Sequence, residues 1–226
     1  MPRTGFQNRL ESLREAVLGM GDLVVSRLRK GLVALDRQNH ELAWDVIDGD
    51  EEVNRRYLEL EQDCIDLLAL QQPVAGDLRF VAASFKIITD LERVGDLAVN
   101  LAEYALYADQ KVFEGVNLRD VGERAVEMVE AALTAYADED AVACVALADR
   151  DADLDATCER ASELVVRDLI ETELGDDADN EEVELLLQDV SRVLLTIRDL
   201  ERVGDHAVNV AARTLYMVET DDRLIE

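Results

Sequence analysis

The chain has 226 residues and carries 51 acidic against 23 basic side chains, which gives a formal net charge of −28. This charge lacks the cationic footprint that nucleic-acid binding needs, and it disfavours contact with an anionic bilayer. Only three of the basic residues are lysines. An acid excess with few lysines suggests a halophilic protein that works in strong salt, where the repulsion between like charges is screened.

Apolar residues recur every three or four positions along almost the whole chain, which predicts helices that bury one face. No stretch alternates apolar and polar residues for long enough to predict a strand. Pro73 separates the second helix from the third, because a proline fits a first turn but not a helix interior. Gly115 and Asn117 mark the joint between the halves, and residues 175–180 form an acidic loop. The predicted helices are, in chain order, 4–37, 40–70, 74–109, 118–137, 139–173 and 181–219.

The longest uncharged run, Leu67–Gly76, has ten residues. A helix needs roughly 20 apolar residues to span a membrane, so we expect no direct membrane insertion. The chain opens without a basic-then-apolar leader. We therefore expect a soluble, cytoplasmic protein. The three cysteines form no CxxC pair and have apolar neighbours, so we expect them to be buried core residues: Cys64, Cys144 and Cys158.

An eleven-residue segment occurs twice, 109 residues apart, as DLERVGDLAVN and as DLERVGDHAVN, and the copies differ only at Leu97 and His206. This offset is close to half of the chain, so the protein is nearly two copies of one unit. We expect an all-α fold of two tandem three-helix bundles, residues 1–113 and 114–226, related by an internal pseudo-twofold axis. The segment that repeats most strictly is rich in acids, so its chemistry is the best clue to function.

Each copy of the repeat contains two acids four residues apart, Glu92 with Asp96 and Glu201 with Asp205. Residues at this spacing lie side by side on one face of a helix. At about 100° per residue, Glu92 and Asp96 fall nearly opposite the apolar stripe, which predicts a position on the outer surface of the bundle. Like charges at this spacing repel by a few tenths of a kcal/mol. Their repetition suggests that a bound cation offsets the repulsion.

A second pair of polar residues occurs in each half, again four residues apart: Asp50 with Asn54, and Asp151 with Asp155. Asp50 and Asp151 each lie on an apolar stripe, where an aspartate is costly unless it is paired, capped or metal-bound. One alternative is that both are N-caps at the start of a helix. The other is that they complete two metal sites with the acids of the repeat.

Clusters of oxygen ligands suit hard or borderline cations such as magnesium, calcium, manganese or iron. A ferritin-type di-iron site is disfavoured because it needs Glu-x-x-His on two helices, and neither His40 nor His206 supplies that motif.

With these residues in view, the chain resembles the PhoU family of accessory regulators of phosphate uptake. The resemblance rests on Gln72-Pro73-Val74-Ala75, on the following Asp77-Leu78-Arg79, and on the doubled Leu-Glu-Arg-Val-Gly-Asp segment. It covers nearly the whole chain and implies two three-helix bundles with pseudo-twofold symmetry.

The resemblance also implies multinuclear iron or zinc clusters held by Glu/Asp-x-x-x-Asp motifs on the bundle surface. In this chain the motifs correspond to Glu92 with Asp96, Glu201 with Asp205, and Asp151 with Asp155. The remaining pair is Asp50 with Asn54, so one carboxylate of the first site is replaced by an amide. We therefore expect the second half to bind metal more tightly than the first.

Functionally, the resemblance implies a regulator that contacts the ATPase subunit of a phosphate ABC transporter and, in many bacteria, a sensor kinase. Such a regulator restrains phosphate uptake or signalling when phosphate is plentiful. The chain shows no nucleophile–base pair and no glycine-rich phosphate loop, which favours an adaptor over an enzyme. Two other interpretations stay open: a metal-dependent phosphohydrolase-like enzyme, and a structural helical homodimer whose acids serve salt adaptation.

Overall fold

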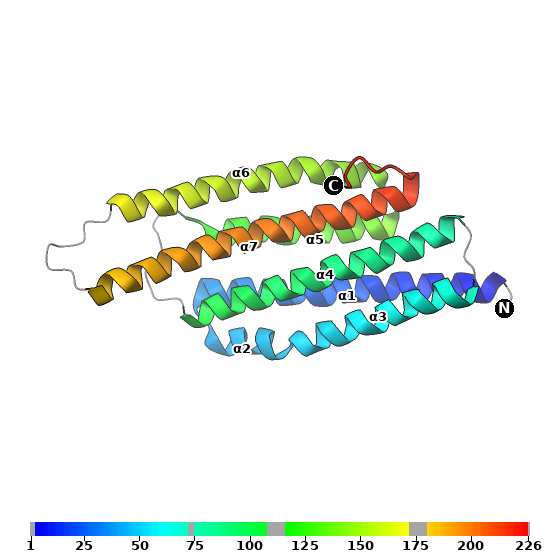
Figure 1. Cartoon of the computed structure of the whole chain (residues 1–226), viewed down its shortest axis with the longest axis horizontal. Helices are drawn as coiled ribbons and strands as arrows, with labels where there is room; N and C mark the ends of the chain where they lie inside the picture. The colour runs from blue at the N-terminus through cyan, green and yellow to red at the C-terminus, as the bar shows by residue number, and fades with distance from the viewer. Residues whose placement is uncertain (1–2, 72–74, 108–115, 172–179, 226) are drawn as a thin grey trace.

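The computed structural model describes residues 3–71, 75–107, 116–171 and 180–225, and within these ranges the fold is all-α (Figure 1). Pro73, Gly115 and the acidic loop before Asn180 lie outside the described residues. The described ranges form seven helices: α1 (Arg3–Arg37), α2 (His40–Asp48), α3 (Asp50–Gln71), α4 (Ala75–Tyr107), α5 (Leu118–Asp138), α6 (Ala141–Glu171) and α7 (Asn180–Glu219).

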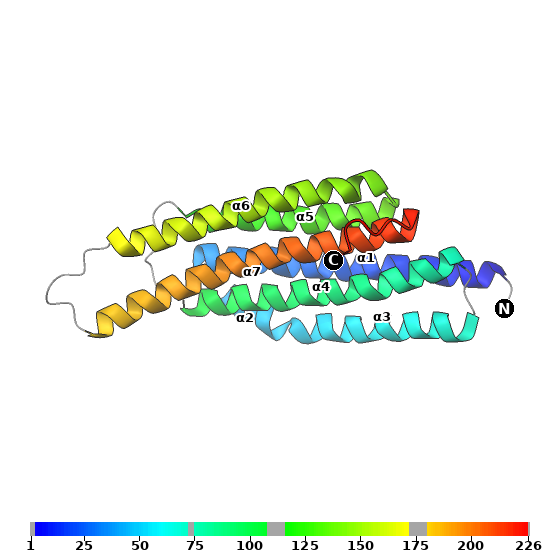
Figure 2. The ribbon, with the colours of Figure 1, turned by 45° about the horizontal axis from the view of Figure 1, so that its top comes forward.

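The helices are arranged as two groups that lie along each other. In the first half, α1, α3 and α4 pack together, and in the second half α5, α6 and α7 do so. The halves meet where α4 packs on α7 and where α1 packs on α5. Both ribbon views show α4 and α7 running side by side through the middle, with α3 and α6 on the outside (Figures 1 and 2).

The predicted helix over 40–70 is wrong in one respect, because the structure divides it at Gly49 into α2 and α3. The guanidinium group of Arg27 lies where a side chain at position 49 would be. From there Arg27 donates to the carbonyl oxygen of Val46 over 3.3 Å and to Glu52 over 3.0 Å. The buried arginine thus bonds the end of α2 and the start of α3, which stabilises the break.

The second half has no such break within α6. Asp151 follows Asp50 by 101 positions. At the same offset, Met128 corresponds to Arg27, and Arg150 corresponds to Gly49. Met128 is buried and presents no cation to the helix beside it. The two halves therefore differ at the start of the segment that carries the predicted second acid pair.

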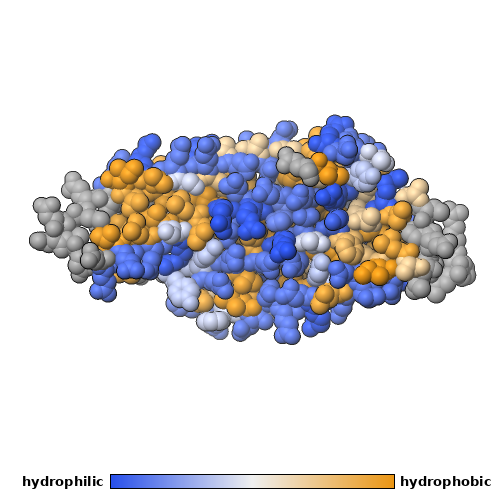
Figure 3. Space-filling view, viewed as in Figure 1, coloured by the Kyte–Doolittle hydropathy of each residue, from blue (hydrophilic) through white to orange (hydrophobic). Residues whose placement is uncertain are grey.

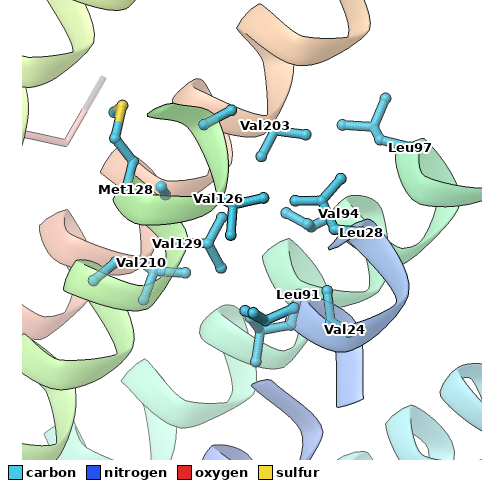
Figure 4. Packing of buried hydrophobic residues seen from close by; sticks show 14 of the residues in the cluster. Val24, Leu28, Leu91, Val94, Leu97, Val126, Met128, Val129, Val203 and Val210 are labelled. Carbon is cyan, nitrogen blue, oxygen red and sulfur yellow. The ribbon is translucent and has the colours of Figure 1, made fainter. Parts of the chain in front are cut away.

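The core is one continuous cluster of mainly aliphatic side chains that runs through both halves. Val24 of α1, Leu91 of α4, Val129 of α5 and Val203 of α7 all belong to it (Figure 4). The three cysteines are buried, as expected. None of the helices within the described ranges is long and apolar enough to cross a membrane.

Candidate metal centre

Three carboxylates come together on the outer side of the second half. Asp151 and Asp155 lie one turn apart on α6, and Asp205 lies on the neighbouring α7. One oxygen from each lies within 4.8 Å of the other two. The spacing of four residues puts the first two on one face, and the packing of the buried Leu154 and Cys158 turns that face towards α7.

The close approach of α6 to α7 at this point depends on Gly204. A β-carbon on Gly204 would lie 2.6 Å from Cδ2 of Leu154 and 3.0 Å from Oδ1 of Asp151. Both distances are too short for an undisturbed contact. The glycine therefore costs about 1 kcal/mol of helix propensity but allows Asp151 to reach the surface of α7.

The electrostatics of this cluster favour a cation. Oδ1 of Asp151 is buried and has no hydrogen-bond partner. Burial, together with the charges of Asp155, Asp205 and Glu201, raises the pKa of Asp151 to about 6. Burial and the charges of Asp155 and Asp205 also raise the pKa of Glu201. A divalent cation would satisfy the buried oxygen and offset the repulsion, so the residues fit a metal with oxygen ligands.

The cysteine beside this cluster is a poorer metal ligand than the carboxylates. Cys158 lies one turn from Asp155 and is fully buried. Burial and the nearby carboxylates Glu201 and Asp155 raise the pKa of the Cys158 thiol to about 12. The thiol is therefore protonated at neutral pH in the metal-free protein, and the available donors are carboxylate oxygens.

The matching residues of the first half are arranged differently. Nδ2 of Asn54 donates to Oδ2 of Asp50 over 2.7 Å, so these two side chains bond to each other. Arg93 lies 3.3 Å from Asp96 and 3.6 Å from Glu92. Burial and Asp96 raise the pKa of Glu92, while Arg93 opposes the rise. The first-half acids are thus partly neutralised by the protein itself.

The structure therefore brings together Asp151, Asp155 and Asp205, with Glu201 beside them. Among the described residues, no other group of three acidic, histidine or cysteine side chains lies this close together. Asp151 lies in the interior of α6, so the N-cap alternative is wrong there, whereas Asp50 is the first residue of α3. Glu92 is half-buried, contrary to the expected outer-surface position, because α3 packs against α4.

Sequence reasoning missed a set of polar contacts that join the two halves. Asp90 of α4 lies 3.0 Å from Nδ1 of His206 and accepts a bond from Asn209 over 3.2 Å. Reciprocally, Asp199 of α7 accepts a bond from Asn100 over 3.0 Å. The signal was present in the sequence, since each copy of the repeat begins with an aspartate and ends with an asparagine.

Comparisons with known proteins agree with this architecture. The family model of the PhoU domain matches the chain twice, over residues 17–105 and 118–214. The chain belongs to the PhoU family. It is 33% identical to the phosphate-specific transport system accessory protein PhoU homolog of Pseudomonas putida, over 96% of this chain and 82% of that protein. It is 31% identical to the accessory protein PhoU of Escherichia coli, over 96% of this chain and 86% of that one.

Solved structures of PhoU proteins have the same fold. The crystal structure of PhoU from Pseudomonas aeruginosa matches with a TM-score of 0.86 and 29% identity, over 96% of this chain and 100% of that one. The phosphate transport system regulatory protein PhoU from Streptococcus pneumoniae also matches with a TM-score of 0.86, at 26% identity, over 98% and 99% of the two chains. The all-α fold predicted from the sequence is confirmed.

Proposed function

We propose that this protein is a regulatory accessory of a phosphate ABC transporter, which contacts the ATPase subunit and lowers phosphate uptake when phosphate is plentiful. The observation that carries the proposal is the double match to the PhoU domain, over both halves. Relatives that align over almost the whole chain are named phosphate-specific transport system accessory proteins. In cells that have a phosphate-responsive sensor kinase, we propose that the protein also contacts this kinase and restrains its signalling.

The metal site is part of the proposal. Asp151, Asp155 and Asp205 would hold the ion, with Glu201 beside them. The family resemblance favours iron or zinc, and the all-oxygen donors also accept magnesium, manganese or calcium. A bound divalent ion would bridge α6 to α7 and add positive charge to a strongly acidic surface. The ion would therefore hold α6 and α7 together more rigidly and make the surface around the site less negative.

The surface for the ATPase subunit is proposed at the end where α6 finishes and α7 begins. Figure 3 shows hydrophobic residues gathered at this end, on the left, beside a hydrophilic centre. The exposed apolar side chains here are Val166, Ile170, Leu185, Leu187 and Leu195. Leu187 and Leu195 also line a hollow of about 380 Å³ together with Tyr104. An apolar contact suits strong salt, because long-range charge attraction is screened there.

The experiment is deletion of the gene and a phosphate-uptake assay in phosphate-replete medium, followed by complementation. Wild-type protein should restore low uptake and co-purify with the ATPase subunit. The variant Leu187→Asp with Leu195→Asp should do neither. Leu58→Asp is the control, because Leu58 is more exposed than Leu187 and Leu195 but lies on α3 at the other side. Unchanged uptake after deletion, with no co-purifying ATPase, would contradict the proposal.

A further inference from the structure

We infer that the outer face of α1 binds a second copy of this chain, with the two α1 helices packed antiparallel and centred on Val25 and Ser26. In Figure 1, α1 and α5 lie behind α4 and α7, on the side away from the viewer. A hollow of about 920 Å³ runs along α1 and α5, and α1 supplies most of its lining. Neither the proposed metal site nor the surface proposed for the ATPase subunit includes these residues, so the inference goes beyond the proposed function.

This face is neutral although the chain is strongly acidic. The charged residues that line the hollow are two acids and two bases: Asp22, Glu130, Arg29 and Lys30. Two copies of a chain with a net charge of −28 repel each other wherever their acidic surfaces meet. The lining of the hollow avoids that repulsion, so a second copy can approach closely here.

The exposed charges of α1 are ordered along the helix. Among its described residues, the exposed acids before Val25 are Glu11, Glu15 and Asp22, and the exposed bases after it are Arg29, Lys30 and Arg37. The one exposed acid after Val25 is Asp36, which lies 3.8 Å from Arg119 of α5. An antiparallel partner therefore places acids opposite bases on both sides of the centre, whereas a parallel partner would place like charges together.

The lining residues of α1 give the register of the contact. Most of them recur at helical spacing on one stripe: Leu18, Asp22, Val25, Ser26, Arg29 and Val33. When Val25 of one copy lies beside Ser26 of the other, antiparallel packing places Arg29 opposite Asp22. The same register places Val33 opposite Leu18, and each of these pairs occurs twice. The stripe is thus complementary to itself, as the twofold axis of a homodimer requires.

The ion pairs that already lie on this face leave room for the contact. Arg29 pairs with Glu130 of α5 over 2.7 Å, and Lys30 pairs with Asp45 of α2 over 2.6 Å. All four side chains are exposed to solvent, and exposed pairs of this kind contribute little to stability. A guanidinium group has five N–H donors, so Arg29 can bind Asp22 of the second copy while it keeps Glu130.

The test is the mass of the protein in solution, measured by sedimentation equilibrium at the lowest ionic strength at which circular dichroism shows a folded chain. Wild-type protein should be a dimer. Asp22→Arg and Arg29→Glu should each weaken the dimer by roughly tenfold or more, because both charged pairs across the interface become repulsions. An equimolar mixture of the two variants should form dimers again, since each pair then joins an acid to a base.

Arg55→Glu is the matched control, because it reverses the charge of an exposed arginine on α3 that lies outside the hollow. It should dimerise as wild type does, and so should Leu187→Asp with Leu195→Asp, whatever its effect on the ATPase subunit. Monomeric wild-type protein, or a mixture that associates no more tightly than either variant alone, would overturn the inference. Loss of the dimer in the leucine variant, with Asp22→Arg still dimeric, would also overturn it.

Discussion

Tyr104 of α4 donates a hydrogen bond over 2.9 Å to Asp199 of α7, whose side chain is 0% exposed. The same carboxylate accepts a bond from Asn100 and ion pairs from Arg198 and Arg202. A buried charge is tolerated only when its oxygens are satisfied in this way. Because Tyr104 and Asn100 lie on α4 and Asp199 lies on α7, these two bonds hold the halves in register.

We expect Tyr104→Phe to destabilise the protein by about 2 kcal/mol, the cost of a lost hydrogen bond to a charged group. The measurement is the free energy of unfolding in urea. Tyr107→Phe is the control, because Tyr107 lies one turn along the same helix and is 70% exposed. Equal stability of the two variants would show that the bond to Asp199 contributes nothing.

Gly49→Ala should destabilise the protein by about 2 kcal/mol or more, since the new β-carbon would occupy the place of the Arg27 guanidinium and break its bonds to Val46 and Glu52. The φ angle of −80° at Gly49 is open to alanine, so backbone strain makes no contribution. Gly19→Ala is the control. It lies in α1 with nothing near its β-carbon position and should stabilise the protein by up to about 1 kcal/mol. Thermal unfolding of both variants separates the two effects, and a neutral Gly49→Ala would argue against the role given to Arg27.

Gly204→Ala should lower metal affinity by roughly tenfold or more, a typical result of disturbing the surroundings of a metal ligand. The added methyl would press on Leu154 and on Oδ1 of Asp151, so the Asp151 carboxylate must shift from its position beside Asp205. Gly95→Ala makes the same change in the first half, where the nearest atom is Cγ1 of Val53 at 3.1 Å. It should leave binding at the second half unchanged in a calorimetric titration. Loss of affinity in both variants would point to a general effect on packing.

The stability of the metal-free protein should depend on pH through Asp151, because folding raises the pKa of its carboxyl from 3.8 to about 6. Between these values the folded state binds a proton that the unfolded chain has lost. The contribution of Asp151 to the free energy of unfolding therefore falls as the pH rises from about 3.8 to about 6, and it is constant above.

Urea unfolding of wild type and Asp151→Asn across this pH range, in metal-free buffer, measures the effect. The stability of wild type relative to the variant should decline with rising pH. Asp153→Asn is the control, since Asp153 is exposed on the same helix. A difference between wild type and Asp151→Asn that does not change with pH would contradict the burial of an unpaired Asp151.

The helices were predictable because their apolar stripes are long, and most predicted ends lie within two or three residues of the observed ones. The break at Gly49 was not, since Val46 and Val53 keep the helical spacing across it. Its cause, Arg27, belongs to another helix. Tertiary packing therefore decided what local spacing could not.

The candidate site was predictable to the same extent. The spacing of four residues predicted that Asp151 and Asp155 lie on one face of a helix, as they do on α6. Their closeness to Asp205 depends on the register of α6 against α7, which the sequence does not state. In each copy of the repeat an arginine follows the first aspartate by three residues, a spacing at which ion pairs form on a helix. Arg202 forms this pair with Asp199, whereas Arg93 pairs with Asp96 and Glu92, and the spacing alone does not distinguish these outcomes.

The central claim is our proposal that the carboxylates of the second half bind a metal ion more tightly than those of the first half. Elemental analysis of protein purified without chelators, in matched salt, tests it most directly. Changing Glu201→Gln together with Asp205→Asn should abolish bound metal, whereas Glu92→Gln together with Asp96→Asn should leave the wild-type content. Equal loss in the two double variants, or no metal in the wild-type protein, would contradict the account.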